Sequence, residues 1–358
     1  MRTFPVSATS FGGEPVRLSD LLVRGPVVLD GAMGTELDAR GVDTRNLLWS
    51  TRALTTAPDV VREVHSDYLD AGARVITTNT YQATLPALIR SGEDAAGARE
   101  VIAAGASLAK EAARRFAEAH PEEPVLVAGG LGPYGAYLAD GSEYTGAYGI
   151  DLPEDPGFQK VHLPRIEALV GEGVDLFALE TLPRLDEAQA LVAMVKGLAP
   201  QAECWVSFQV RPDGATLADG TPLAEAAAWA AQEEIVVAVG INCVAPGVVG
   251  RALPVLRAAT GKPLVAYPNA GDLYDPATKT WQSTGEGAGI AALASAGVSE
   301  RLRDALEASG RRVWLATQVI EDPDGDHDWR LTALVDLAEC DRDGRAVVHL
   351  LSVGPQQG

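Results

Sequence analysis

The chain has 358 residues, of which 47% are hydrophobic, and its formal net charge is -20 at pH 7. A chain of this length can bury a large core, and its negative charge argues against a nucleic acid partner and an anionic membrane surface, because both would repel it. No run of about 18 apolar residues occurs and residues 1–11 lack the pattern of a signal peptide, so we expect a cytoplasmic protein without a membrane partner.

Short apolar runs alternate with segments that have apolar residues at helical spacing. Residues up to about 22 resemble an irregular lead-in, and a Gly-rich turn is expected at 31–37. The predicted strands lie within residues 26–30, 74–81, 125–133, 174–181, 204–210, 236–242 and 262–269. Helices are predicted at 58–72, within 83–120, at 158–170 and 185–198, between 220 and 236, and at 246–259. Strands that are apolar on both faces predict a parallel sheet covered by helices.

Polar side chains gather where the predicted strands end. They are Asp30, Asn79, Glu180, Asn242 with Cys243, and Asn269. In an open doubly wound sheet the functional residues lie near one switch point, whereas contributions from many strands favour a closed (β/α)8 barrel of the TIM type, with its site at that rim. Seven strand-helix units are one short, so the eighth strand is expected to be atypical or missing.

Three of these positions suggest chemistry. Glu180 ends an almost apolar run, where a carboxylate is costly unless it is paired or binds a ligand. Cys243 follows a buried strand at a turn, so it is either a small buried hydrophobe or an exposed functional thiol. Gly31 and Gly34 allow the backbone to approach a ligand closely, because the turn lacks the glycine motifs of a nucleotide site.

Four tyrosines, Tyr134, Tyr137, Tyr144 and Tyr148, follow the third predicted strand. Such rings could surround a sulfonium or quaternary ammonium group through cation–π attraction. Alternatively, they only cover a surface, which is common for loop tyrosines. Both interpretations stay open at this point.

With these residues identified, the chain resembles the homocysteine S-methyltransferase family. The matching segments, in the family's order, are Asp30-Gly-Ala-Met-Gly-Thr-Glu-Leu37, Thr77-Thr-Asn-Thr-Tyr-Gln-Ala83, Glu180-Thr181, Val206-Ser-Phe208, Asp219-Gly-Thr-Pro-Leu223, Gly240-Ile-Asn-Cys243 and Tyr267-Pro-Asn-Ala-Gly271. The resemblance implies a barrel enzyme that methylates the thiol of homocysteine to give methionine. S-methylmethionine is the expected donor, because no segment resembles a folate or cobalamin domain.

The resemblance also implies roles for individual residues. Asp30 and Glu180 would hold the amino group of homocysteine, Gly31 would make backbone contacts, and Asn79, Asn242 and Asn269 would help to bind the amino acid. Cys243 would be catalytic as one of three cysteine ligands to zinc. Coordination to Zn²⁺ deprotonates a thiol that is mostly protonated at neutral pH, which fits this role.

The sequence departs from the family after residue 281. The Gly-Gly-Cys-Cys-Arg segment that supplies the other two zinc ligands does not occur, and Cys340, His327 and His349 are the only further candidates, each better explained by chance. We therefore expect a barrel over residues 1–282 and a divergent segment over 283–358, with a helix at 299–309 and a small antiparallel meander of strands at 313–320, 329–337 and 346–353.

Two functions follow from this departure. The first is an active methyltransferase whose zinc site the sequence does not complete. The alternative is an impaired or inactive relative that keeps the amino-acid pocket as a binding or regulatory module. A nucleotide-binding α/β protein is disfavoured because the phosphate-binding motifs are missing.

Overall fold

The computed structural model describes residues 10–11, 14–150 and 155–269, together with strand segments 273–275, 280–282, 313–319, 329–336 and 348–355. A parallel sheet of six strands forms its centre, in the order of the chain. The strands are β3 (Val75–Thr77), β4 (Leu126–Leu131), β5 (Leu176–Leu182), β6 (Glu203–Phe208), β7 (Val236–Asn242) and β8 (Leu264–Tyr267).

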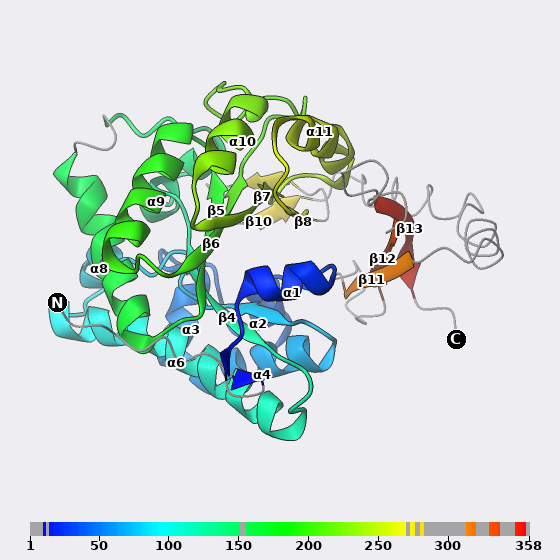
Figure 1. Ribbon diagram of the computed structural model, residues 1–358. Coiled ribbons are helices and arrows are strands. Elements are labelled where there is room, and N and C mark those ends of the chain that lie inside the picture. Colours follow the sequence, from blue (N-terminus) through cyan, green and yellow to red (C-terminus); the bar gives the residue numbers. More distant parts are fainter. Residues whose placement is uncertain are drawn as a thin grey trace.

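Strands β4 to β7 each pair with the strand before and the strand after in sequence, and the edge strands β3 and β8 pair with β4 and β7. The sheet curls, with the larger helices outside it (Figure 1). This order has no switch point, so it is the arrangement of a barrel-like α/β fold and not of a doubly wound sheet. In the described residues, the sheet is therefore a half-barrel of six strands.

The first predicted strand is reduced to a single parallel bridge between Leu29 and Val75. The amide N–H of Asp30 still donates to the carbonyl of Val75 at 2.9 Å, so Asp30 lies beside β3 as a strand residue would. The segment is short and Gly31 follows directly, which leaves too few residues for a longer ladder. The prediction of a full strand at 26–30 was therefore wrong, although the position of Asp30 beside its neighbour is retained.

The main helices lie where the apolar spacing predicts them. Helix α4 begins at Pro58, a residue suited to the first turn of a helix. Asp94 and Asp155 directly precede α6 and α8, and their side chains accept hydrogen bonds from amides of the first turn. The helices are α1 (Leu18–Arg24), α2 (Met33–Ala39), α3 (Ala53–Thr56), α4 (Pro58–Asp70), α5 (Leu85–Arg90), α6 (Ala95–Ala119), α7 (Tyr134–Leu138), α8 (Pro156–Glu172), α9 (Leu185–Leu198), α10 (Leu223–Gln232) and α11 (Pro246–Ala259), with 3-10 turns η1 (Trp49–Arg52) and η2 (Ser142–Tyr144).

Two segments near the N-terminus differ from the prediction. Helix α1 replaces the irregular lead-in, because Leu18 and Leu21 are buried on one face of a segment too short to show a clear period. Helix α2 replaces most of the Gly-rich turn. Within it, a Cβ on Gly34 would lie 2.5 Å from the ring of Trp49, so this glycine makes room for a side chain of the protein itself.

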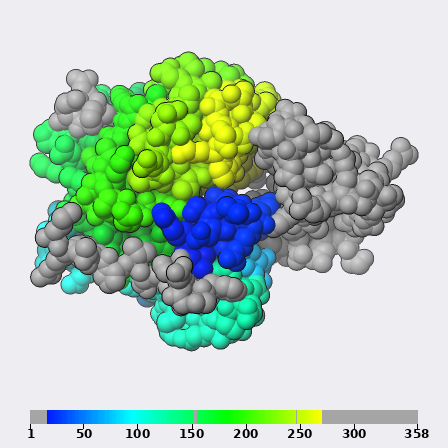
Figure 2. All heavy atoms as spheres, viewed as in Figure 1, coloured from blue at the N-terminus to red at the C-terminus, as the bar shows by residue number. Residues whose placement is uncertain are grey.

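Side-chain alternation divides the core into an outer and an inner layer. Phe177 and Val206 face outward into the large core beneath the helices, whereas Ala178, Trp205 and Ala238 face the concave side. Helix α1 packs against this concave side, and Figure 2 shows it (blue) next to the segment of β8 and α11 (yellow). The inner core thus fills the N-terminal half of the sheet's concave face and leaves the C-terminal half to polar residues.

The remaining strands pair outside this sheet. Strands β1 (Ser10–Phe11) and β2 (Glu14–Pro15) form one antiparallel pair, and β9 (Leu273–Asp275) and β10 (Thr280–Gln282) form another. Strands β11 (Val313–Val319), β12 (Trp329–Asp336) and β13 (Val348–Pro355) form a three-stranded antiparallel sheet. The predicted helix at 299–309 lies outside the described residues. None of the helices in the described ranges has the length and apolarity that a membrane span requires.

Candidate functional site

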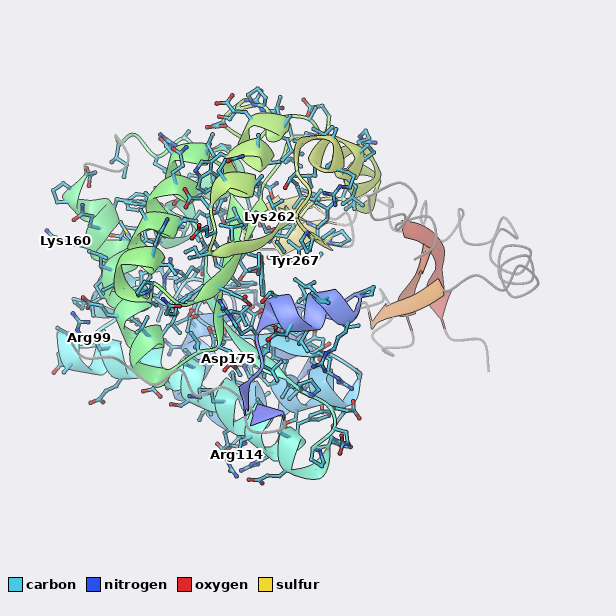
Figure 3. The ribbon with its side chains drawn as sticks, in the orientation of Figure 1. Arg99, Arg114, Lys160, Asp175, Lys262 and Tyr267 are labelled. Carbon is cyan, nitrogen blue, oxygen red and sulfur yellow. The ribbon has the colours of Figure 1, made fainter. Side chains whose placement is uncertain are left out.

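Polar side chains meet on the concave face at the C-terminal end of the sheet. Glu180 on β5, Ser207 on β6, Asn242 on β7 and Tyr267 on β8 face inward above the apolar layer that contains Trp205. Ser207 pairs with Gly240 and Asn242 pairs with Tyr267, so the last two lie two residues further along their strands. Tyr267 is labelled in Figure 3. Four adjacent strands therefore each deliver one polar group to the same place, as the ends of parallel strands do in barrel enzymes.

Glu180 is held in this layer by hydrogen bonds and by available space. The Tyr267 hydroxyl donates to its Oε2 at 3.0 Å and itself accepts from the Trp205 indole N–H at 3.2 Å. A Cβ on Gly130 would lie 3.5 Å from Glu180 Oε1 and only 3.0 Å from Thr77, so glycine is favoured at that position on β4. Burial raises the pKa of Glu180 to about 7, against the opposing effects of Tyr267 and of Arg165.

Asp30 supplies a second carboxylate beside Glu180. Its Oδ2 accepts from the Thr77 amide at 2.6 Å and its Oδ1 accepts from the Thr77 hydroxyl at 3.2 Å. Burial, assisted by the negative charge of Glu180, raises the pKa of Asp30 to about 8. Within the described residues neither carboxylate forms an ion pair. Two neighbouring, half-buried acids of this kind favour a cationic ligand, which would relieve both the desolvation and the repulsion.

Cys243 lies near Glu180. Its Sγ contacts the Asn242 side-chain amide at 3.3 Å and the Thr181 hydroxyl at 3.8 Å. Burial and the charge of Glu180 raise the pKa of the Cys243 thiol to about 11, despite these two hydrogen bonds. Without a further positive group the thiol therefore stays protonated at neutral pH.

Asn242 holds two strained residues in place. Thr181 and Cys243 have φ angles of 62° and 51°, in a region that non-glycine residues rarely adopt. The Asn242 Oδ1 accepts from the Thr181 amide at 2.8 Å and from Ser207 Oγ at 2.6 Å, while its Nδ2 donates to Thr181 Oγ1 at 2.7 Å. Because both amide atoms are occupied within the chain, Asn242 is suited to position Cys243 and Glu180.

A bulge in β5 accompanies this strain. Leu179 pairs with Val206 and Leu182 with Phe208, so β5 contains one residue more than β6 over the same span. Bulges of this kind redirect side chains next to active sites. Here the extra residue falls at Glu180 and Thr181, where one side chain enters the concave face and the other reaches Cys243.

The remaining predicted site residues lie close to strand ends but are engaged within the protein. Asn79 is buried, accepts from Ser50 Oγ at 2.7 Å and donates to the Ser50 carbonyl at 2.8 Å. The amide of Asn269 donates to the carbonyl of Val244, directly after Cys243. A Cβ on Gly31 would lie 2.7 Å from the Tyr68 hydroxyl, so contact with that ring already accounts for this glycine.

Several residues of this region have no individual role in the sequence prediction. Ser207 and Tyr267 could have been found from strand alternation, since they face the same side as Glu180 and Asn242. The structure also places Tyr81 against Trp49, with ring centroids 6.1 Å apart. Glu143, which comes from η2, has no signal in the sequence, because only tertiary packing brings this loop residue to the site.

The tyrosine cage is not formed as the sequence allowed. The Tyr134 ring packs against Tyr137 and Tyr148, with centroid distances of 5.4 and 5.5 Å. The guanidinium groups of Arg90 and Arg184 already lie over Tyr137 and Tyr148, at 4.5 and 5.6 Å from the ring centroids. These three tyrosines thus form a packed cluster that binds the protein's own cations.

A buried arginine stabilises the loops that carry the site. Arg165 on α8 is completely buried and donates to the carbonyls of Tyr81 at 2.7 Å and Gly132 at 2.8 Å. Its Nη2 also contacts His162 Nδ1 at 2.8 Å, and the opposite nitrogen of that ring lies 3.8 Å from Glu187 Oε1. Burial lowers the pKa of His162, so the ring is neutral and can accept from Arg165.

We expect Arg165→Met to lower the free energy of unfolding by about 3–5 kcal/mol, because it leaves the buried carbonyl oxygens of Tyr81 and Gly132 and the ring of His162 without their hydrogen-bond donor. Urea unfolding followed by circular dichroism measures this change. The control is Arg114→Met, which removes an exposed ion pair on α6 (Figure 3) and should change stability by less than about 1 kcal/mol. Equal effects of the two substitutions would contradict the assigned role of Arg165.

A metal site requires more ligands than the described residues provide. Cys243 offers one sulfur, and no group of three histidine, cysteine, aspartate or glutamate side chains within the described ranges could hold a metal ion. Zinc normally takes three or four protein ligands, so this part of the chain alone does not fit a zinc site. Cys340, His327 and the side chain of His349 lie outside the described residues.

Comparison with known proteins relates most of the chain to one family. Residues 27–316 match the family model described as Homocysteine S-methyltransferase, and residues 282–353 match a domain of unknown function, DUF3516. The chain is 45% identical over 261 residues to the homocysteine S-methyltransferase of Escherichia coli strain K12, a match that covers 73% of this chain and 83% of that protein. It is 40% identical over 279 residues to the homocysteine S-methyltransferase YbgG of Bacillus subtilis strain 168, covering 77% and 85%.

Among solved structures, the chain is similar to the metallated form of the homocysteine methyltransferase MmuM from Escherichia coli. The TM-score is 0.66 at 43% sequence identity, and the match covers 73% of this chain and 91% of that chain.

Proposed function

Since the chain belongs to the homocysteine S-methyltransferase family, an enzyme family, we propose that it transfers a methyl group from S-methylmethionine to the thiol of homocysteine. The observation that supports this proposal most directly is the pair of half-buried carboxylates, Asp30 and Glu180, with Cys243 near Glu180. The two acids suit an ammonium group, and the neighbouring sulfur suits the thiol end of the same molecule. We also propose that the curled sheet belongs to a closed barrel of eight strands, and that the enzyme acts in the cytoplasm.

In this proposal the acceptor lies across the C-terminal ends of β3 to β8. Asp30 and Glu180 hold the ammonium group of homocysteine, and the Tyr267 hydroxyl fixes the orientation of Glu180. Asn242 keeps Thr181 and Cys243 in their strained conformations and therefore acts as a positioning residue. Gly31, Asn79 and Asn269 shape the same rim, where we expect them to contact the amino acid through backbone or side-chain atoms.

The chemical step is a displacement at the methyl carbon. The homocysteine sulfur releases its proton to solvent and forms a bond to this carbon, while the bond between the carbon and the sulfonium sulfur breaks and its electron pair stays on the donor sulfur. The leaving group is neutral methionine, and the methylated acceptor is a second methionine. The described residues contribute by orienting the acceptor and by excluding water from the concave face.

Zinc bound through Cys243 remains part of the proposal, supported by the family and by the metallated state of the similar MmuM structure. Such a metal would supply a thiolate at neutral pH, which the isolated Cys243 environment disfavours. Because the described residues supply one cysteine only, we assign no step to the metal.

The decisive experiment measures methionine formation from homocysteine and S-methylmethionine, with and without added zinc. We expect turnover that requires both substrates. The absence of turnover under all metal conditions, together with retained binding of homocysteine, would instead support a non-catalytic binding module. The comparisons favour the enzyme, because both relatives named above are homocysteine S-methyltransferases.

We expect homocysteine binding to weaken as the pH falls below about 8. The pKa values of Asp30 and Glu180 without ligand are about 8 and about 7. A bound ammonium group lowers both pKa values. Homocysteine therefore binds most tightly above these pH values, and its affinity is lost as the pH falls through them. For each carboxylate that must lose a proton on binding, the dissociation constant of homocysteine increases by up to about tenfold per unit decrease in pH.

Calorimetry between pH 6 and pH 8 measures this dependence and should show a dissociation constant at least about tenfold higher at pH 6. In Glu180→Gln, which has one titrating group fewer, the slope should be shallower. A pH-independent dissociation constant in the unsubstituted protein would contradict the assignment of the two acids to the ammonium group.

A further inference from the structure

Glu143 is a third acid close to the site, and it has no role in the chemical step described above. It belongs to η2, only 6% of its surface is exposed, and its Oε2 has no hydrogen-bond partner among the described residues. The turn η2 lies against β5, the strand that carries Glu180. The charge of Glu143 contributes to raised pKa values of both Cys243 and Tyr81, so the carboxylate is close to these groups.

The backbone around Glu143 is fixed by close packing. A Cβ on Gly135 would lie 2.3 Å from the Glu143 amide nitrogen, so α7 and η2 are in direct contact at this point. The Gly146 amide donates to the Ser142 carbonyl at 2.8 Å, which closes the turn on its other side. The acid is therefore held in the protein interior and cannot simply turn into solvent.

Among the described residues, the two other acids in the same burial class, Glu187 and Glu203, have partners for their carboxylates, whereas Asp175 Oδ1, at the opposite end of the sheet, also lacks one. Glu187 accepts from the Tyr134 amide at 2.6 Å and from the Tyr148 hydroxyl at 2.7 Å. Glu203 accepts from the Ser19 amide at 3.1 Å and lies 3.2 Å from Arg17 Nε. Burial, with a smaller contribution from the charge of Asp140, raises the pKa of Glu143 to about 7 against the backbone amides of Glu143 and Gly141, and no described cation is among these causes. A buried carboxylate with a free oxygen is costly unless a ligand completes it.

Asp30 and Glu180 already answer the ammonium group of the acceptor, so a different cation is needed for Glu143. The donor S-methylmethionine carries two cationic groups, an ammonium and a sulfonium, and only the sulfonium must lie beside the homocysteine thiol for the methyl group to be transferred. A sulfonium has no N–H to donate, so it is recognised by charge and by aromatic rings and not by hydrogen bonds. Tyr81, whose pKa the charge of Glu143 helps to raise, provides such a ring near the acid, and Trp49 packs edge-on against Tyr81.

We propose that Glu143 binds the sulfonium group of the methyl donor and thereby selects a sulfonium compound over the corresponding neutral thioether. This inference rests on the proposed function for the identity of the donor. The attraction is strongest before the reaction, because the donor sulfur becomes neutral when its bond to the methyl carbon breaks. Glu143 therefore lowers the KM for the donor more than it raises kcat, and its attraction disappears when the neutral product forms.

Equilibrium binding of two probes tests the proposal without requiring turnover. The probes are S-methylmethionine and methionine, which differ only by the methyl group that makes the sulfur cationic. We expect the unsubstituted protein to bind S-methylmethionine at least about tenfold more tightly than methionine, and Glu143→Gln to remove most of this preference. Glu143→Gln should leave the dissociation constant of homocysteine unchanged.

Asp140→Asn is the matched control. It removes one negative charge from the same loop, but Asp140 is exposed and its Oδ1 accepts from the Ser142 amide, which an asparagine oxygen can also do. We expect this variant to keep the preference for S-methylmethionine. If Glu143→Gln keeps the preference for S-methylmethionine over methionine, the proposal is wrong. It is also wrong if the unsubstituted protein binds both probes equally or binds neither, and this second test does not depend on a folded variant.

The two levels of inference fail in different ways. Methionine formation with an unchanged donor preference in Glu143→Gln would overturn the role of Glu143 and leave the proposed function intact. Donor binding that depends on Glu143 without any methionine formation would support the sulfonium site and contradict the proposed enzyme activity.

Discussion

Glu180→Gln is expected to weaken homocysteine binding by at least about tenfold and to reduce turnover at low homocysteine by the same factor or more. Glutamine keeps the size of the side chain and an oxygen that can accept from Tyr267, so the change removes mainly the negative charge. A hydrogen bond to a charged group contributes about 1.5–3 kcal/mol, which corresponds to roughly 10–150-fold in affinity. Calorimetric titration with homocysteine measures the effect directly.

Asp175→Asn provides the matched control for this substitution. Asp175 is also an acid beside β5, and burial raises its pKa to about 7, but it precedes the strand and accepts from the Val127 amide at 2.7 Å. It therefore lies at the N-terminal end of the sheet, opposite to the proposed site, and is labelled in Figure 3. Homocysteine affinity should be unchanged in this variant. Equal losses in the two variants would mean that Glu180 acts through stability and not through contact with the ligand.

Cys243→Ala is expected to reduce methionine formation by at least about 10²-fold and to abolish any stoichiometric zinc. Among the described residues, Cys243 is the cysteine near Glu180, whereas Cys204 lies in the outer core of the sheet. Loss of the Cys243 sulfur should leave the fold intact, because the residue is only partly buried at the end of β7. Metal analysis and a methionine assay on the same protein preparation measure both effects.

Cys204→Ala is the corresponding control. Its thiol is fully buried on β6 and burial raises its pKa, so it behaves as a small apolar side chain. We expect a loss of about 1 kcal/mol in stability from the small cavity, with zinc content and activity retained. If zinc persists in Cys243→Ala, the metal is bound elsewhere and Cys243 is not its ligand.

The order of elements could be predicted from periodicity because the strands and helices are long enough to show their spacing. The ends of α9 at Leu185 and Leu198 coincide with the predicted ends, and α4 begins at Pro58 as expected. Short segments were less predictable. The first predicted strand is only a single bridge at Leu29. Helix α1 forms in a segment without a visible periodic pattern, because its contacts with the concave face of the sheet stabilise it.

The candidate site was only partly predictable for a related reason. Glu180 and Asn242 end apolar strands, so their positions on parallel strands bring them to one rim. Their partners follow from side-chain alternation once the strand boundaries are known, as for Ser207 and Tyr267. Glu143 could not be found in this way, because its place depends on how α7 and η2 fold back against β5.

The sequence by itself determined that this is an α/β protein with acids, amides and a thiol at the ends of successive parallel strands. These features depend on local composition and on the twofold alternation of strands, which are readable without a structure. The tertiary structure alone decided that Asp30 and Glu180 share one desolvated region, that Asn242 stabilises the strained Thr181 and Cys243, and that Glu143 approaches from a distant loop. Burial and electrostatic coupling arise between segments far apart in the chain, so no local pattern encodes them.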